Sequence, residues 1–290
     1  MKQVQQDQLI YYILPHWGIV NAFTTKHGGV SQGHTARMNV DASKEPPTQV
    51  QAVQQNLAIL GRALGFDPAS LTGLRQTHTA RVQVVSGTHR GNHLYKPDVW
   101  GGCDGMVTAD PSLTLLTAHA DCPALYMYDP VSQVIGLAHA GWRGTVGDIA
   151  AETLRQMVSL GAKPERMLAG ISPGVGPCCF QVDTPVVEQF LAAWDWAKGY
   201  IQSDPDTSHK YKLDLLGINQ QLMRNAGIPT ANITAESICT CCHQLLFHSH
   251  RVSGFNRGNM GAILSLQPTK ASSLSVPFMG HHAGVHGSRN

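Results

Sequence analysis

Short apolar runs that mix irregularly with amphipathic segments are the feature that most constrains the fold of this chain. The clearest helix is predicted over residues 50–64, where five aliphatic residues recur at spacings of three and four: Val50, Val53, Leu57, Leu60 and Leu64. Weaker helical periodicity covers residues 146–161, 184–197 and 214–226. Strands are expected over residues 20–25, 82–86, 104–108, 113–118, 124–128, 134–139, 167–171 and 260–266. Because helices and strands do not alternate regularly, the pattern favours an α+β fold with mixed sheets over a doubly wound parallel sheet.

The domain organisation is predicted from what interrupts the chain. No low-complexity linker or internal repeat divides residues 1–267, so we expect a single domain there. The hydrophobic content of 42% is ample for one core. Residues 268–290 are small and polar, and we expect them to form a loosely ordered tail.

Charge and hydropathy limit the partners of the chain. Its 21 basic and 19 acidic residues give a net charge of +2. A nucleic-acid-binding protein is usually much more basic than this. The N-terminus has no signal-peptide core, and no run approaches the roughly 20 apolar residues of a membrane helix. We therefore expect a cytoplasmic protein, in which the seven cysteines should be reduced. We also favour a monomer.

The segment HADCPALYMYDPVSQVIGLAHAGWRG, residues 119–144, reads as a hairpin with polar groups at its mouth. If Pro130 and Val131 form the centre of the turn, Cys122 lies directly opposite His139. Opposed residues have Cβ atoms about 4.5–5.5 Å apart, close enough to share a metal ion. A shift of one residue would break this pairing.

A catalytic zinc site usually has three protein ligands and one open position. His78 is the best third candidate, because it immediately precedes a β-branched run. The set His78, Cys122 and His139 suits Zn²⁺, and copper could enter it in vitro. The residues alone leave the ordinary alternative open, which is a buried cysteine beside a hydrogen-bonded histidine.

Several motifs carry a family resemblance. GGVSQG, QTHTARV, CDGMVT, ADCPAL, AHAGWRGTV and ISPGVGPCCFQV occur in an order, over about residues 20–266, that resembles the YfiH family, whose members are also labelled laccase-domain proteins or purine nucleoside phosphorylases. The resemblance implies a single-domain α/β/β/α sandwich of the CNF1/YfiH-like type. It also implies one zinc ion held by His78, Cys122 and His139. The implied activities are phosphorolysis of purine nucleosides, including methylthioadenosine, and deamination of adenosine.

These activities assign roles to further residues. Phosphorolysis needs a phosphate site, and Arg143 is a candidate because it lies between glycines at the start of a helical segment. Arg251 and Arg257 are additional candidates, and the resemblance makes Asn39 a substrate contact. Lys26 stands where the family usually has an arginine before GGVS, which predicts weaker or altered substrate binding, since lysine cannot form a bidentate fork.

Deamination needs an activated water and a proton carrier. We assign proton transfer to His119, and His248 and His250 stay open as alternatives. Asp121, next to the predicted ligand Cys122, is expected to be a turn or supporting residue.

Three other functions compete with this interpretation. A copper-dependent polyphenol oxidase would need many histidines in H-x-H pairs, and one such pair is present, at 248–250. A peptidoglycan-precursor editing hydrolase could use Cys122 as its nucleophile. A non-catalytic metal-binding module could be built from CC at 178–179 and CTCCH at 239–243, but we treat Cys241 and Cys242 as incidental and expect no such cluster.

Overall fold

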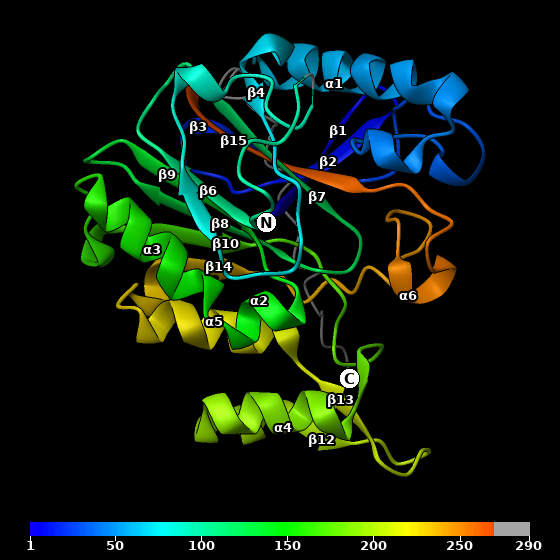
Figure 1. Ribbon diagram of the computed structural model, residues 1–290, viewed down its shortest axis with the longest axis vertical. Coiled ribbons are helices and arrows are strands. Elements are labelled where there is room, and N and C mark those ends of the chain that lie inside the picture. The colour runs from blue at the N-terminus through cyan, green and yellow to red at the C-terminus, as the bar shows by residue number, and fades with distance from the viewer. Residues whose placement is uncertain (95, 270–290) are drawn as a thin grey trace, which may run out of the picture.

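The computed structural model describes residues 1–94 and 96–269, and two six-stranded sheets account for most strands of this part of the chain (Figure 1). The first sheet contains, in spatial order, β1 (Lys2–Gln6), β2 (Leu9–Ile13), β3 (Ile19–Thr24), β15 (Met260–Pro268), β7 (Thr114–His119) and β4 (Leu71–Thr72). The second contains β14 (Ile233–Ala235), β10 (Leu168–Ile171), β8 (Ala124–Asp129), β9 (Val134–His139), β6 (Gly105–Thr108) and β5 (Val82–Val84). Both sheets mix parallel and antiparallel pairs, as predicted.

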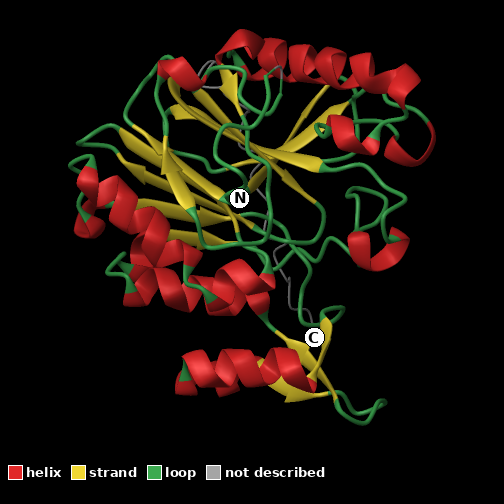
Figure 2. Cartoon of the chain, in the orientation of Figure 1, coloured by secondary structure: helices red, strands yellow, loops and turns green. Residues whose placement is uncertain are grey.

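Helices cover the outer face of each sheet. The first sheet packs against α1 (Val50–Leu64), and the second packs against α3 (Ile149–Ser159) and α5 (Leu215–Asn225). Figures 1 and 2 show the resulting layers, with the two sheets between the helices. The predicted α/β/β/α sandwich is therefore confirmed.

A smaller unit projects from the side of α5 (Figure 1). It consists of α4 (Thr184–Ala193) and a three-stranded sheet in the order β11 (Gln181–Asp183), β13 (Lys210–Leu213) and β12 (Ile201–Ser203). Its buried residues join the same hydrophobic cluster as α3 and α5.

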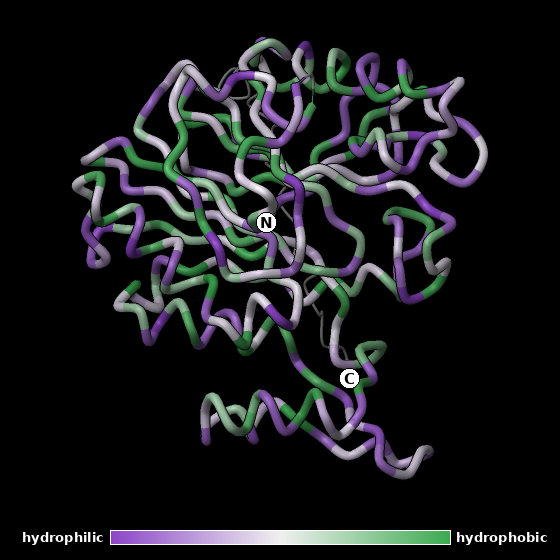
Figure 3. Tube along the Cα trace, in the orientation of Figure 1, coloured by the Kyte–Doolittle hydropathy of each residue, from purple (hydrophilic) through white to green (hydrophobic). Residues whose placement is uncertain are grey.

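Hydrophobic side chains fill the space between the two sheets. Phe23, Leu115 and Leu264 from the first sheet meet Tyr126 and Leu137 from the second, and all five are fully buried. The Tyr126 hydroxyl donates a hydrogen bond of 2.7 Å to the carbonyl of Ala22, so a polar link also joins the sheets. Figure 3 shows the alternation of hydrophobic and hydrophilic residues along α1 that lets this helix bury one face.

The predicted helix over residues 50–64 is observed with those bounds, and Gly65 ends it in the left-handed conformation at φ 90°. The predicted helix over residues 146–161 is observed as α3, which begins at Ile149, and a short helix, α2 (Trp142–Val146), precedes it. Asp148 separates them, and its side chain accepts a bond from the amide of Ala151. The predicted strands are all observed, whereas β1, β2, β4 and β11 to β14 were not predicted.

The predicted hairpin exists, but its predicted register is wrong. Ala124, not Cys122, pairs with His139, and the connecting loop has four residues between Asp129 and Val134. The Asp129 carboxylate accepts hydrogen bonds from the amides of Val131 and Ser132 at 2.9 and 3.2 Å, which stabilises this wider loop. Cys122 therefore lies in the loop before β8. The predicted tail, residues 268–290, lies outside the described residues beyond Thr269.

Candidate metal centre and its cavity

His78, Cys122 and His139 come together in the structure. Their ligand atoms all lie within 4.8 Å of one another, and the rings of the two histidines are 4.9 Å apart between centroids. His78 precedes β5, Cys122 lies in the loop between β7 and β8, and His139 ends β9. Three segments far apart in sequence thus present one thiol and two imidazoles to a common point, as the resemblance implied.

Asp104, immediately before β6, orients two of these residues. Its Oδ1 accepts hydrogen bonds from His139 Nδ1 at 2.9 Å and from the amide of His78 at 3.0 Å. Its other oxygen accepts from the amide and hydroxyl of Thr79. A carboxylate on Nδ1 fixes the imidazole tautomer and leaves Nε2 for a metal ion. Burial alone would raise the pKa of Asp104, but its bond to His139 and the backbone amides lower it, so Asp104 stays ionised.

Asp104 was not predicted as a functional residue. The available signal was an acidic residue, in the quoted motif CDGMVT, at the start of a buried strand, where a side chain without exposed surface needs hydrogen-bonding partners.

Gly141 leaves space for the three ligands. A Cβ atom there would lie 2.8 Å from His78 Cδ2 and 3.3 Å from Cys122 Sγ. Any larger residue would push these side chains aside, so a glycine is required at this position. The gap and the thiolate–imidazole donor set together fit a borderline divalent cation such as Zn²⁺.

The charges of the three ligands support the same interpretation. Burial would raise the pKa of the Cys122 thiol, but His139 and His78 outweigh it and lower the pKa to about 6. Burial would likewise lower the pKa of His139, but the Cys122 thiolate and Asp104 raise it. A thiolate is therefore available near neutral pH, and the thiolate is the form that binds metal ions.

The three ligands line a cavity of about 1030 Å³. Basic side chains outnumber acidic ones in its lining, with two acids, Asp41 and Asp121, against five bases: Lys44, Arg75, Arg143, Arg251 and Arg257. A concave site with this excess of positive charge attracts anions.

Arg143 is the best placed of these cations for binding an anion. It is exposed to the cavity, and its guanidinium lies 4.3 Å above the Trp142 ring. Among the described residues it makes no hydrogen bond or ion pair through its side chain. Its helix, α2, has five residues, which is too short for an anion site at the helix terminus, so the candidate binding group is the side chain.

The other two predicted arginines are held in place by protein groups. Arg251 donates from its side chain to the carbonyl of Gln181 at 2.9 Å and from its backbone amide to Asp121 at 2.6 Å. Arg257 donates to the carbonyl of Gly258 at 3.1 Å and to the side chain of Asn259, while its buried Nε has no partner among the described residues. Both line the main cavity.

Lys26 and Asn39 are absent from the described lining of the main cavity. Lys26 lines a separate cavity of about 330 Å³ and donates to the carbonyl of Gln244 at 2.5 Å. The amide of Asn39 is fully buried, and its oxygen and nitrogen are bonded to Asp41, Glu45 and Asn259. In this geometry Asn39 supports the loop that carries Asp41 to the cavity. Its direct contact with a substrate stays a prediction.

The three candidate proton carriers occupy different environments. His119 is buried, with Nε2 bonded to Thr117 at 2.8 Å and Nδ1 bonded to the carbonyl of Cys122 at 3.0 Å, and burial followed by the charge of His139 lowers its pKa well below the usual value. Burial also lowers the pKa of His248 to about 4, and this residue lines the smaller cavity. His250 lines the main cavity and is exposed, with only Nδ1 bonded, to the carbonyl of Gly254. His250 is therefore better placed for proton transfer than His119, which supports the Cys122 loop.

Asp121 ties the far wall of the cavity to the metal centre. It has a positive φ of 84°, and its carboxylate accepts from the Thr240 hydroxyl at 2.6 Å and from the Ser249 hydroxyl at 3.0 Å. This agrees with the expected turn and supporting role.

Every helix in the described part of the chain is too short or too polar to cross a bilayer.

Comparisons with known proteins place these observations in a family. Residues 20–267 match the family model described as "Multi-copper polyphenol oxidoreductase laccase". A protein of Deinococcus radiodurans named "Purine nucleoside phosphorylase" is 37% identical over 254 residues, which cover 87% of this chain and 91% of the relative. "Adenosine deaminase RL5", from an unknown prokaryotic organism, is 32% identical over 240 residues, covering 82% of this chain and 91% of the relative.

Solved structures give the same result. The crystal structure of the Bacillus licheniformis hypothetical protein YfiH superposes with a TM-score of 0.84 at 30% identity and covers 91% of this chain and 98% of that chain. YlmD from Geobacillus stearothermophilus superposes with a TM-score of 0.78 at 29% identity, covering 91% of this chain and 98% of that chain. As its motifs predicted, the chain therefore belongs to the laccase-like family of the YfiH and YlmD proteins.

Proposed function

We propose that this protein is a zinc-dependent purine nucleoside phosphorylase that also deaminates adenosine and cleaves methylthioadenosine. The observation that carries the proposal is the placement of His78, Cys122 and His139 in the wall of a cavity with excess positive charge. The relative from Deinococcus radiodurans is named a purine nucleoside phosphorylase, which supports phosphorolysis. A second relative is named an adenosine deaminase, which supports deamination.

Phosphorolysis transfers the ribosyl group from the purine to phosphate. A phosphate oxygen bonds to C1′ while the C1′–N9 bond breaks, and the electron pair of that bond leaves with the purine. Arg143 binds the phosphate through its two-pronged guanidinium, and Arg257, fixed by Gly258 and Asn259, adds a second positive charge. These residues position phosphate and neutralise its charge in the cavity.

His78, Cys122 and His139 would hold the zinc ion, and Asp104 would keep His139 oriented toward it. When bound, the ion supplies Lewis-acid chemistry and lowers the pKa of water to about 7, as deamination requires. His250 accepts and returns protons from the cavity wall, since its Nε2 is not bonded to any described residue.

A second candidate is a cysteine hydrolase, such as the peptidoglycan-precursor editing enzyme considered above. The lowered pKa of Cys122 beside His139 favours it, because a thiolate–imidazole pair is also the arrangement of a nucleophilic cysteine. A nucleophilic Cys122 would work without metal, whereas the phosphorylase would not.

The family model's description also raises multi-copper oxidation of phenols. Such enzymes combine an electron-transfer copper with further histidine-ligated coppers. Within the described residues, the groups suited to metal binding are one with two histidines and another made only of cysteines. This donor set favours the nucleoside reaction over copper oxidation.

The proposal is tested by giving the zinc-loaded protein inosine with and without phosphate and measuring hypoxanthine and ribose 1-phosphate. We expect hypoxanthine release only with phosphate, and loss of both products after zinc removal. Hypoxanthine release that ignores phosphate would overturn phosphorolysis, and activity that survives zinc removal would favour the cysteine hydrolase.

The role of Arg143 is tested by Arg143→Ala. Because hydrogen bonds to charged groups contribute about 1.5–3 kcal/mol, the KM for phosphate should rise about 10- to 100-fold with a smaller effect on the KM for nucleoside. Arg155→Ala is the matched control, since Arg155 is an exposed arginine on α3 paired with Glu152 and absent from the cavity lining. Equal effects of the two substitutions would contradict the assigned role.

A further inference from the structure

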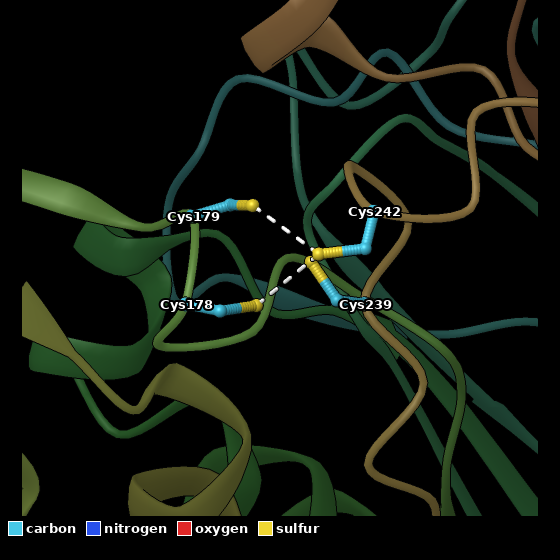
Figure 4. A group of neighbouring side chains, drawn as sticks. All are labelled: Cys178, Cys179, Cys239 and Cys242. Carbon is cyan, nitrogen blue, oxygen red and sulfur yellow. Dashed lines mark hydrogen bonds between the residues drawn. The ribbon is translucent and has the colours of Figure 1, made fainter.

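Four cysteines that the proposed function does not use meet beside the cavity wall (Figure 4). The sulfur atoms of Cys178, Cys179, Cys239 and Cys242 all lie within 4.8 Å of one another. The sulfur of Cys242 is 3.5 Å from those of both Cys178 and Cys179. These separations exceed the roughly 2.05 Å of a disulfide, and all four cysteines are free.

The separations match those of a tetrahedral metal site. With metal–sulfur bonds of about 2.3 Å, the sulfur atoms of a tetrahedral site are about 3.8 Å apart. The two sulfur–sulfur distances of 3.5 Å and the common limit of 4.8 Å are compatible with one ion bound by all four thiols. An all-thiolate set of this kind selects zinc or iron among the common divalent ions.

The sequence pattern agrees with this geometry. Two residues separate Cys239 from Cys242, which is the C-x₂-C spacing of structural zinc sites, and Cys178 with Cys179 supplies the other two sulfurs. The expectation that Cys242 is incidental is wrong, because its sulfur faces the other three (Figure 4). Cys241 is not part of this group of four sulfur atoms.

The backbone around the cysteines is fixed. The amide of Thr240 donates to the carbonyl of Gly174 at 3.0 Å, and the amide of Gly174 donates to the carbonyl of Ile238 at 3.2 Å, so the two cysteine segments are joined. The amide of Gly176 donates to Cys239 Sγ at 3.2 Å, a bond that favours the thiolate. A Cβ on Gly176 would lie 3.3 Å from Cys239 Cβ and 3.4 Å from Cys178 Sγ, so the backbone here packs closely against both cysteines.

The cysteine segments are bonded to the cavity wall. The amide of Val175 donates to the carbonyl of Asp121 at 2.8 Å, and the Thr240 hydroxyl donates to the Asp121 carboxylate at 2.6 Å. Val175 and Phe180 line the main cavity. An ion that joined the two segments would therefore hold this wall against the loop that carries Cys122.

We propose that Cys178, Cys179, Cys239 and Cys242 bind one zinc or iron ion in a second, structural site that fixes the cavity wall. The site is independent of the proposed reaction, since its four ligands are distinct from His78, Cys122 and His139.

Metal content separates the two sites. The full chain is purified under reducing, oxygen-free conditions, and its zinc and iron are measured per chain. We expect two ions in the wild type, one in Cys122→Ser, one in the Cys178→Ser/Cys242→Ser variant, and none in the combination of all three substitutions. Cys241→Ser is the matched control, and it should keep two ions.

A second measurement reports which ligands surround the bound metal, first in the wild-type protein and then in two single variants. Wild-type protein stripped of metal is titrated with Co²⁺, because cobalt bound to four thiolates absorbs more strongly through sulfur-to-metal charge transfer than cobalt bound to one thiolate and two imidazoles. We expect this strong absorption to persist in Cys122→Ser and to disappear in Cys178→Ser.

Three results would overturn the proposal. The first is one ion per wild-type chain that is lost with Cys122→Ser alone. The second is loss of the second ion in Cys241→Ser. The third is a disulfide between Cys242 and either Cys178 or Cys179, detected by peptide mass spectrometry under the same reducing conditions.

Discussion

Asp104 shows how one buried carboxylate organises the candidate metal centre. It is fully buried and accepts hydrogen bonds from His139 and from the backbone of His78, which has a positive φ of 60°. Backbone strain of this kind persists only where the surroundings impose it. Asp104 therefore positions two candidate ligands at once. It holds His139 through the imidazole ring and His78 through the backbone amide.

Asp104→Asn should weaken zinc binding by about 10- to 100-fold, the usual effect of losing a supporting bond to a ligand histidine. The amide cannot accept from His139 Nδ1 and from the surrounding amides as a carboxylate does. The measurement is competition for zinc with a chromophoric chelator. Asp110→Asn is the control, because Asp110 also caps backbone amides, at Gly87 and Ser112, but is absent from the cavity lining. Unchanged zinc affinity in Asp104→Asn would contradict the positioning role.

The lowered pKa of Cys122 predicts a pH dependence. The ordinary value of 9.0 falls to about 6 in the folded protein, so the thiolate persists at neutral pH and is lost only as pH falls through about 6. Thiolate absorbance of the metal-free protein, taken as wild type minus Cys122→Ser, should rise with a midpoint near pH 6. Zinc affinity should decrease below the same pH, because protons compete for the thiolate.

Cys103→Ala is the control for this titration. Burial, followed by the charge of Asp98, raises the pKa of Cys103 to about 12, so this thiol contributes no thiolate near pH 6. A midpoint near 9 in the difference titration would show that His139 and His78 do not stabilise the Cys122 thiolate.

At the scale of elements, the turn from β9 into α2 determines whether the ligands can approach one another. Gly141 occupies this turn, between His139 and Trp142. Its missing side chain is what allows His78 and Cys122 to lie beside the strand end.

Gly141→Ala should therefore reduce bound zinc while the protein stays folded. The added Cβ would lie 2.8 Å from His78 Cδ2, closer than real contacts permit, so His78 must move away from the centre. Circular dichroism and zinc content are the measurements. Gly199→Ala is the control, since a Cβ there meets no atom within 4 Å. Full zinc occupancy in Gly141→Ala would contradict this account.

At the scale of the whole molecule, the two sheets are joined mainly by apolar contacts and by the bond from Tyr126 to Ala22. Tyr126→Phe removes that bond and leaves a buried carbonyl with one partner fewer, which should cost about 1–2 kcal/mol. In a chain of this size the melting temperature should fall by a few degrees.

Tyr128→Phe is the matched control for thermal unfolding. Tyr128 lies on the same strand, but its hydroxyl accepts from Gln133 in the hairpin loop rather than joining the sheets. We expect a smaller loss of stability there. Equal decreases in melting temperature for the two variants would show that the bond between Tyr126 and Ala22 contributes no more to stability than the bond in the hairpin loop.

Sequence patterns were informative where they depend on local physics. The apolar stripe of α1 and the alternation of the central strands follow from burial of one face, and both were predicted with bounds close to those observed. Strands such as β4 and β12 are too short to show a pattern, and contacts with distant residues define them.

The sequence by itself determined the sandwich of helices and sheets and named His78, Cys122 and His139, since apolar periodicity and family motifs are local properties of the chain. Only the tertiary structure decided the hairpin register and the hydrogen bonds between Asp104 and two candidate ligands. It also decided that the Arg143 side chain faces the cavity without a hydrogen-bond or ion-pair partner among the described residues, and that four cysteine sulfurs lie close together. Each of these depends on segments that are far apart in sequence, and their distances are set by packing rather than by neighbouring residues.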